Sequence, residues 1–186
     1  MPSELVVDPT RKLEGSYATI TEAIAAALPH DRIRVRPGAY EEGLVITKPL
    51  TIFGDGDANR VRIKATGKPT LVYDSKEGPS RVAKLTLIQG GGGVWNALEV
   101  LQGDPLIEEC DIMSETLAAV GIHGASANPT LRKNRIFDSH SEGISCYDYG
   151  TGCIEDNKIF GNKGKREFRR VCCPAVHFTC LHPFPF

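Results

Sequence analysis

Residues 128–136 read Asn-Pro-Thr-Leu-Arg-Lys-Asn-Arg-Ile, and residues 104–112 read Asp-Pro-Leu-Ile-Glu-Glu-Cys-Asp-Ile. The two stretches align without a gap. Each has an apolar residue, two charged residues, a small or amide residue and a second apolar residue in the same order. The same spacing recurs at residues 82–87 and 154–159. Internal repetition at a nearly fixed period is the sequence signature of a repeat architecture.

The repeat has a period near 23 residues, and its four copies begin 25, 24 and 23 residues apart. This length accommodates two or three short strands with their turns, but not a strand and a full helix. Leucine-rich repeats have a similar period, but their L-x-x-L-x-L and asparagine motif is absent. The pattern therefore predicts a parallel β-solenoid whose successive coils pair at about 4.8 Å.

Stacked coils would bring equivalent residues into columns. Asn hydrogen-bonds backbone groups at bends and tolerates the left-handed conformation, so Cys110, Asn134 and Asn157 are expected to form an inward-pointing structural ladder. Two neighbouring columns alternate in charge, which favours in-register stacking. These columns are Lys84, Glu109, Lys133 and Asp156, and Ala83, Glu108, Arg132 and Glu155. A second apolar element aligns Ala97-Leu98 with Gly121-Ile122 and Gly143-Ile144.

The N-terminal part differs from the repeats. Thr19 and Glu22 match a capping box, and apolar residues follow at helical spacing up to Leu28, before Pro29. The sequence predicts an amphipathic helix over residues 19–28 that covers the open end of the solenoid and protects its strand edges. Short strands are expected at 32–36, 44–46, 50–53, 61–63 and 71–73.

The domain boundaries follow from where the repeat ends. The β-helix is expected over residues 1–162, and residues 163–186 are expected to form a non-repeat tail. Another coil would require a small and an apolar residue near position 166, where the sequence instead has a basic run. The spacing of the cysteines and histidines in the tail matches no usual zinc site, so we expect no metal. They are Cys172, Cys173, His177, Cys180 and His182.

Composition excludes several classes of function. The chain has 22 Lys and Arg against 23 Asp and Glu, for a net charge of −1. No protein-wide positive field therefore attracts nucleic acid or an anionic membrane. No apolar run approaches the roughly 18 residues of a membrane span, and the first residues lack the features of a signal peptide. We expect the six cysteines to be reduced, in a cytoplasmic or nuclear protein.

Several segments resemble a known superfamily. Residues 17–24, 31–42 and 46–54 resemble the opening of the pectate-lyase-like right-handed β-helix superfamily. Residues 128–138 and 152–160 are most similar to the carbohydrate-binding and sugar-hydrolase (CASH) repeats of the F-box only protein eleven family and of similar bacterial β-helix proteins. The resemblance implies a right-handed β-helix over residues 4–162. In the F-box family this domain recruits substrates to a ubiquitin ligase, so the resemblance also implies protein binding. This sequence shows neither the F-box nor the zinc-binding domain of that family.

The superfamily also includes enzymes that act on pectin. Residues 38–42, Gly-Ala-Tyr-Glu-Glu, resemble the G-x-Y-x-E-type turn of pectin methylesterases, with Glu42, not Glu41, at the final position. The aspartate pair and the arginine that those esterases carry on later coils are not found. Residues 62–64 match the R-I-K of polygalacturonases in letters, but they lie too early and alone. An exposed-buried-exposed strand explains them better.

A few other residues are weak candidates for a site. His123, Asp138 and Glu142, with His140 and Asp148 nearby, are expected near one side of adjacent coils, where they could act as an acid–base pair on a carbohydrate. Solvated turn residues are the simpler interpretation. Trp95, beside a glycine-rich turn, could offer a stacking surface. Residues 54–59 begin like a calcium loop, but Thr66 occupies the position of the bidentate glutamate.

The sequence thus predicts an all-β protein, a right-handed parallel β-helix with an N-terminal capping helix. The function predicted first is non-catalytic binding of a protein or glycan partner by a side face of the solenoid, as in F-box-type ubiquitin ligase adaptors. Neither an enzyme activity nor a cofactor is expected. The alternative is a carbohydrate-active lyase or hydrolase.

Overall fold

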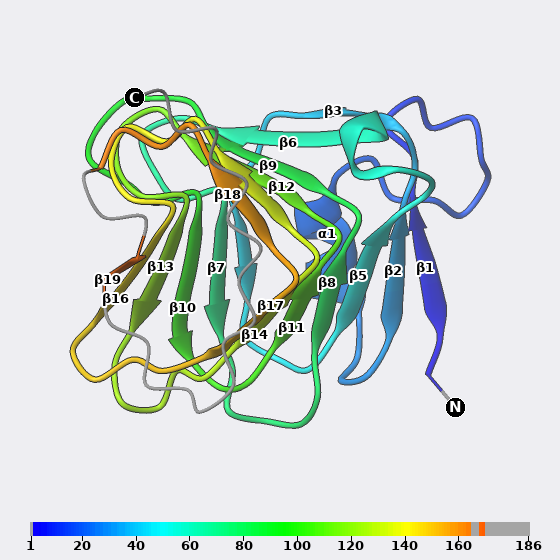
Figure 1. The fold of residues 1–186 in the computed structure, drawn as a ribbon. Helices are drawn as coiled ribbons and strands as arrows, with labels where there is room; N and C mark the ends of the chain where they lie inside the picture. The colour runs from blue at the N-terminus through cyan, green and yellow to red at the C-terminus, as the bar shows by residue number, and fades with distance from the viewer. Residues whose placement is uncertain (1, 165–167, 170–186) are drawn as a thin grey trace.

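The computed structural model describes residues 2–164 together with 168 and 169, and it is a right-handed parallel β-helix (Figure 1). From β2 onward, each coil contributes one strand to each of three parallel sheets, and β1 adds a further strand to one of them. Sheet A consists of β1 (Glu4–Val7), β2 (Arg32–Val35), β5 (Thr51–Gly54), β8 (Arg81–Ala83), β11 (Leu106–Glu108), β14 (Thr130–Arg132) and β17 (Cys153–Glu155). Sheet B consists of β3 (Gly38–Tyr40), β6 (Val61–Ala65), β9 (Thr86–Gln89), β12 (Asp111–Ser114), β15 (Arg135–Phe137) and β18 (Lys158–Phe160). Sheet C consists of β4 (Leu44–Ile46), β7 (Leu71–Asp74), β10 (Leu98–Gln102), β13 (Val120–His123), β16 (Ile144–Tyr147) and β19 (Phe168–Arg169).

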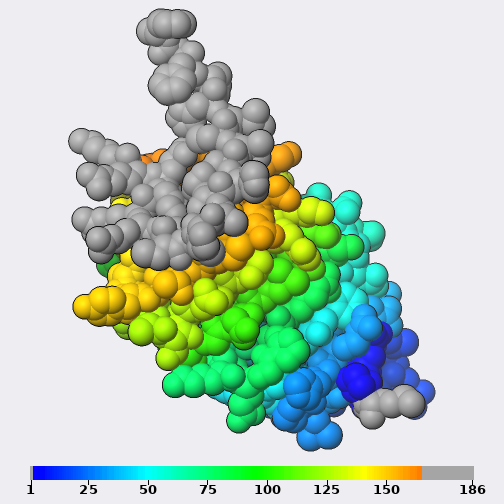
Figure 2. All heavy atoms as spheres, turned by 60° about the horizontal axis from the view of Figure 1, so that its bottom comes forward, coloured from blue at the N-terminus to red at the C-terminus, as the bar shows by residue number. Residues whose placement is uncertain are grey.

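The core is a set of stacked apolar columns inside the three sheets. In sheet A the register places Ile107 between Val82 and Leu131, and all three side chains are completely buried. Burying such a side chain stabilises the fold by about 1.5–3 kcal/mol. Figure 2 shows the coils as successive bands from blue to orange along one axis. The predicted fold class and the predicted stacking of the repeat are confirmed.

The second apolar element stacks in a different register from the one expected. Val120, not Ile122, lies between Leu98 and Ile144 in sheet C. A shift of two residues keeps the same side chains facing outward, because side chains in a strand alternate with a period of two. It moves β13 along its neighbours, however, and so changes which outward residues are adjacent.

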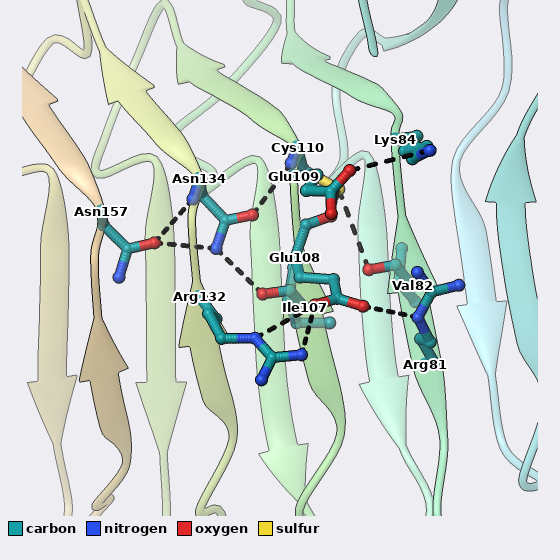
Figure 3. A network of polar contacts seen from close by, with 10 residues as sticks. All are labelled: Arg81, Val82, Lys84, Ile107, Glu108, Glu109, Cys110, Arg132, Asn134 and Asn157. Carbon is teal, nitrogen blue, oxygen red and sulfur yellow. Dashed lines mark hydrogen bonds and ion pairs between the residues drawn. The ribbon is translucent and has the colours of Figure 1, made fainter. Parts of the chain in front are cut away.

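The turn between sheets A and B contains the asparagine column. Asn134 Oδ1 accepts a hydrogen bond from the backbone N–H of Cys110 at 3.0 Å, and Asn134 Nδ2 donates to the carbonyl of Ile107 at 2.9 Å. Asn157 repeats the pattern one coil later, because its Oδ1 accepts a hydrogen bond from the N–H of Asn134 at 2.9 Å (Figure 3). Its Nδ2 donates to the carbonyl of Leu131 at 2.8 Å. The side chains thus satisfy backbone groups that the sheets leave unpaired.

The left-handed residue of this turn is not the asparagine. It is the residue before each column member: φ is +57° at Lys84, +54° at Glu109, +55° at Lys133 and +54° at Asp156. The tolerance of asparagine for the left-handed conformation is therefore not what places Asn134 and Asn157 in this column. Each such residue costs about 1–2 kcal/mol, which the hydrogen bonds of the asparagine column help to offset.

The charged columns form ion pairs between coils. Glu108 is nearly buried and lies between Arg81 and Arg132, with 2.6 Å from its carboxylate oxygens to Arg81 Nε and to Arg132 Nη2 (Figure 3). Lys84 and Glu109 make a longer, exposed pair at 3.8 Å. Burial alone would raise the pKa of Glu108, but the hydrogen bonds from Arg132 and Arg81 outweigh it and hold that pKa below its usual range.

The N-terminal helix α1 (Ile20–Ala26) is shorter than the predicted range 19–28. The capping box of Thr19 and Glu22 is formed, and α1 lies against β1, β2 and β4 at the N-terminal end of the solenoid (Figure 1). Ala27 is already extended, and Leu28 is 69% exposed. Leu28 precedes a proline, which disfavours the helical conformation at that position.

The structure also explains the pectin-methylesterase-like turn at residues 38–42. The Glu42 carboxylate accepts hydrogen bonds from the backbone N–H groups of Ile20 and Thr21, both at 2.9 Å. The buried Tyr40 donates its hydroxyl proton to the carbonyl of Arg36 at 2.8 Å. Glu42 therefore holds the first turn of the helix, and Tyr40 fixes the turn between β2 and β3.

One strand follows the predicted end of the repeat. Phe168 of β19 pairs with Ile144, which lies 24 residues earlier, so sheet C continues beyond residue 162. The expected tail of residues 163–186 thus begins with one more strand of the same sheet. The rest of that tail, with the cysteines and histidines considered for a zinc site, lies outside the described residues.

No helix in the described part of the chain is long and apolar enough to cross a membrane.

Candidate functional site on the outer face of sheet C

The outer face of sheet C gathers polar and aromatic side chains from three consecutive strands. Glu99 of β10, Gly121 of β13 and Ser145 of β16 share one register position. The next outward position brings His123 beside Tyr147. Because the strands are in register, functional groups far apart in the sequence lie one coil apart, about 4.8 Å, on this face.

Glu99 is the centre of this cluster. Its carboxylate accepts a hydrogen bond from Asn96 Nδ2, at 2.5 Å to Oε1, and another from the Tyr147 hydroxyl, at 3.1 Å to Oε2. Tyr147 lies two coils away, so the contact passes over Gly121. A Cβ atom at Gly121 would lie 2.6 Å from Glu99 Oε2 and would also collide with Asn96 Nδ2. The glycine thus gives the carboxylate room to lie against the sheet.

Burial lets Glu99 keep its proton at a higher pH than an ordinary glutamate. Burial raises the pKa of Glu99, and this effect exceeds the opposing effects of the hydrogen bonds from Asn96 and Tyr147 and of the nearby His123. Burial and the charge of Glu99 raise the pKa of Tyr147 to about 12, so its hydroxyl remains a donor. A carboxylic acid that holds its proton at higher pH is suited to general acid catalysis.

A second pair of groups continues the cluster. His123 Nε2 lies 2.7 Å from Asp148 Oδ2, and the imidazole ring stacks on the Tyr147 ring with centroids 4.7 Å apart. Asp148 directly follows β16 and has a left-handed backbone, with φ of +49°. The aspartate fixes the orientation of the imidazole, a common arrangement for a histidine that accepts a proton.

Asn96 and Trp95 lie at the entry to β10. Asn96 is only 1% exposed, and its Oδ1 is the one buried side-chain oxygen or nitrogen in the described residues without a hydrogen-bond partner. The backbone of Trp95 is fixed by Ser114, whose hydroxyl donates to the Trp95 carbonyl at 2.8 Å. The indole ring is 39% exposed. The stacking residue expected from the sequence therefore directly precedes the amide that contacts Glu99.

The structure corrects the acid–base set expected from the sequence. It pairs His123 with Asp148 but brings neither Asp138 nor Glu142 to it. Asp138 lies in the turn after β15, and the carbonyl of Glu142 accepts from the N–H of Ala119, before β13 begins. His123 is the last residue of β13. At about 3.3 Å per strand residue, the four-residue separation between Ala119 and His123 is about 13 Å.

Sequence reasoning missed Asn96, Glu99 and Tyr147. The expected register placed Leu98 beside Ile122, which put Glu99 level with His123 and two residues away from its observed neighbour Gly121. The observed register, with Val120 beside Leu98, places Glu99 beside Gly121. That combination of a charged residue and an adjacent glycine in one outward column was the available signal.

A pocket of about 310 Å³ lies elsewhere, at the corner of sheets A and B. Three cations and three carboxylates line it: Lys84, Lys133, Arg135, Asp57, Glu109 and Asp111. Arg135 pairs with Asp111 at 3.0 Å and Lys84 with Glu109 at 3.8 Å, so most of its charges are already compensated. The sheet C cluster instead has the half-buried carboxyl group of Glu99 and the buried Asn96 Oδ1 without a hydrogen-bond partner. The described residues contain no group of three or more His, Cys, Asp or Glu that could hold a metal ion.

The fold defines a protein of the parallel β-helix class. The model of the family "Protein of unknown function (DUF1565)", a right-handed β-helix family, matches residues 12–178, and the chain belongs to that family. Among solved structures, the pectin methylesterase PemA from Erwinia chrysanthemi is similar, with a TM-score of 0.63 and 17% identity over 80% of this chain and 53% of PemA. A pectin methylesterase mutant in complex with a hexasaccharide has a TM-score of 0.55 and 14% identity, over 82% of this chain and 66% of that one.

These likenesses establish the shared fold. The chain spans about half the length of PemA. The resemblance to the β-helix superfamily found in the sequence is confirmed at this level. The closer relationship to the F-box only protein eleven family is not shown by these comparisons.

Proposed function

We propose that this chain is a carbohydrate-active β-helix protein that binds a glycan across the outer face of sheet C and cleaves it by acid–base catalysis. The observation that carries the proposal is the continuous contact from Glu99 through Tyr147 and His123 to Asp148. It supplies a half-buried carboxyl group and an aspartate-oriented histidine on one accessible face, which can serve as the general acid and the general base of a hydrolysis.

The reaction divides between the two ends of the cluster. Protonated Glu99 gives its proton to the glycosidic oxygen as the bond from that oxygen to the anomeric carbon breaks. His123 takes a proton from a water molecule, and the water oxygen bonds to the anomeric carbon. The products are two shorter sugars, and Glu99 regains a proton while His123 loses one. Asp148 stabilises the imidazolium, and Tyr147 orients the Glu99 carboxyl group.

Three observations support a glycan as the ligand. Tyr147, Tyr149 and Trp95 expose 38%, 89% and 39% of their surface, and such aromatic residues offer an apolar face with a polar edge. The face is open and extends over successive coils, which suits a polymer better than an enclosed small molecule. One pectin methylesterase of similar fold was obtained in complex with a hexasaccharide.

The first function suggested by the sequence was a non-catalytic, F-box-type protein-binding module. It rests on the resemblance of the repeats alone. A half-buried carboxyl group connected to a histidine–aspartate pair is unnecessary for such a module, whereas acid–base catalysis can use both groups. The carbohydrate-active alternative is therefore the better supported of the two.

The proposal is tested by glycan turnover. The full chain is incubated with xylan, β-glucan, glucomannan, pectin, polygalacturonate, alginate and chitin oligosaccharides, and new reducing ends are measured. We expect turnover of at least one glycan, with large losses in Glu99→Gln and in His123→Ala. Phe160→Ala, an exposed residue of β18 on sheet B, serves as the control and should retain full activity. Turnover that persists unchanged in Glu99→Gln would exclude the assigned roles.

A further inference from the structure

Lysine and arginine are unevenly distributed over the three sheets. In the described strands, sheet A contains Arg32, Arg34, Arg81 and Arg132, and sheet B contains Arg62, Lys64, Arg135 and Lys158. The five consecutive strands β4, β7, β10, β13 and β16 of sheet C contain neither residue type. Arg169 enters sheet C only in β19, beside Ser145.

The same five strands do carry negative charge. Asp74 of β7 accepts a hydrogen bond from Gln102 of β10. Asp148 follows β16, and its side chain is 71% exposed. A ligand that lies across these strands therefore meets the carboxylates of Asp74 and Asp148. In the described strands before β19, every lysine and arginine belongs to sheet A or sheet B.

Apart from His123, which is paired with Asp148, the remaining polar groups on the face are uncharged. Gln102, Ser145 and Tyr147 carry amide or hydroxyl groups, and the Oδ1 of Asn96, a residue that is 1% exposed, has no hydrogen-bond partner in the described residues. Amides and hydroxyls both donate and accept hydrogen bonds, which matches the hydroxyl groups of a sugar. A uronate carboxylate would instead need a cation or several N–H donors to replace its lost water.

We propose that the outer face of sheet C binds an uncharged glycan and discriminates against polyuronates. This inference rests on the proposed function, since it assigns the substrate class of the same site. Repulsion between uronate carboxylates and those of Asp74 and Asp148 gives the discrimination, because like charges brought together at an interface oppose binding and no lysine or arginine of the five strands offsets them. An uncharged chain avoids that repulsion and exchanges hydrogen bonds with the amides and hydroxyls.

Affinity electrophoresis with a matched pair of polymers tests the inference. The pair is polygalacturonate and carboxyl-reduced polygalacturonate, in which each C6 carboxylate is replaced by a hydroxymethyl group while the linkages stay the same. Xylan, β-glucan and glucomannan extend the uncharged set, and alginate extends the anionic set. The full chain is compared with Tyr147→Ala at the site, with Arg169→Gln at the end of sheet C and with the control Phe160→Ala on sheet B.

We expect retardation by at least one uncharged polymer, loss of it in Tyr147→Ala and retention in Phe160→Ala. Polygalacturonate should bind at least about tenfold more weakly than its reduced form. Equal or tighter binding of polygalacturonate, dependent on Tyr147 or Arg169, would overturn the substrate class and leave the proposed function standing. Binding of no polymer, or binding that ignores Tyr147→Ala, would contradict the proposed function and this inference with it.

Discussion

The hydroxyl of Tyr147 donates a hydrogen bond to the carboxylate of Glu99, with 3.1 Å between the oxygens, although the two residues are 48 positions apart in the sequence. The contact exists because β10, β13 and β16 are in register and because Gly121, between the two residues, has no side chain. It connects a buried acid to the His123–Asp148 pair. The structure thereby turns three separate repeats into one chemical site.

Replacing Glu99 should change the pH dependence of stability. The pKa of Glu99 is raised in the folded protein, chiefly by burial, so its contribution to stability is present at low pH and is lost as the pH rises through that raised value. Glu99→Gln removes the cost of ionisation. Thermal unfolding should show that the stability of the variant relative to the wild type is higher at pH 7.5 than at pH 4. The lower pH lies below the ordinary glutamate pKa of about 4.3. A difference in stability that does not depend on pH would contradict the raised pKa of Glu99.

Replacing Glu108 should have the opposite pH dependence. Although burial opposes it, the hydrogen bonds from Arg132 and Arg81 lower the pKa of Glu108, so its contribution is present above the unfolded value and is lost as the pH falls through the folded one. Glu108→Gln should cost about 1–3 kcal/mol at pH 7, because two charge-assisted hydrogen bonds are lost while the part-exposed arginines remain screened by solvent. Urea denaturation at pH 7 and at pH 3 measures this change in the free energy of unfolding. A cost that is equal at both pH values would contradict the ion-pair origin.

A methyl group at Gly121 should disrupt the site more than the fold. In Gly121→Ala the Cβ would lie 2.6 Å from Glu99 Oε2, and the flexible glutamate side chain must move away. We expect loss of glycan binding with a change of less than about 2 kcal/mol in the free energy of unfolding. The exposed Val45, an outward residue of β4, provides the control Val45→Ala. Full binding by Gly121→Ala would show that the position of the Glu99 carboxylate is unimportant.

The asparagine column should matter for stability and not for binding. Asn134→Leu leaves the N–H of Cys110 and the carbonyl of Ile107 without these partners in the interior. We expect a loss of about 1–3 kcal/mol, seen as a lower denaturation midpoint, with glycan binding retained under folding conditions. Asn128→Leu, in an exposed turn, is the control and should unfold near the wild-type midpoint. An unchanged denaturation midpoint in Asn134→Leu would show that the asparagine column does not stabilise the fold.

The fold followed from the sequence because stacking repeats the same local demands in every coil. Ile107 and Leu131 recur at the same place in the pattern, and each must be buried against the next coil. The capping box of Thr19 and Glu22 is equally local, and it forms as expected. The left-handed conformation, by contrast, depends on the path of the turn, and it falls on Lys133 rather than on Asn134.

The site could be predicted only in part. His123 and Asp148 were both among the candidates, but a one-letter pattern does not give the register between strands. The two-residue error at Val120 hid the proximity of Glu99 to Gly121. The raised pKa of Glu99 depends on burial by residues from other coils, which no local pattern contains. Sequence periodicity therefore identified the outward face without identifying which residues meet on it.

The most direct test of the proposed site is to locate a bound glycan by NMR. ¹H–¹⁵N spectra of the full chain are recorded while the uncharged oligosaccharide form of the polymer that binds best is added. We predict shift changes concentrated at residues 95–99, 121–123 and 145–149 on sheet C. Changes concentrated instead at Lys84, Glu109 and Lys133, around the pocket between sheets A and B, would contradict the assignment of the functional site to sheet C.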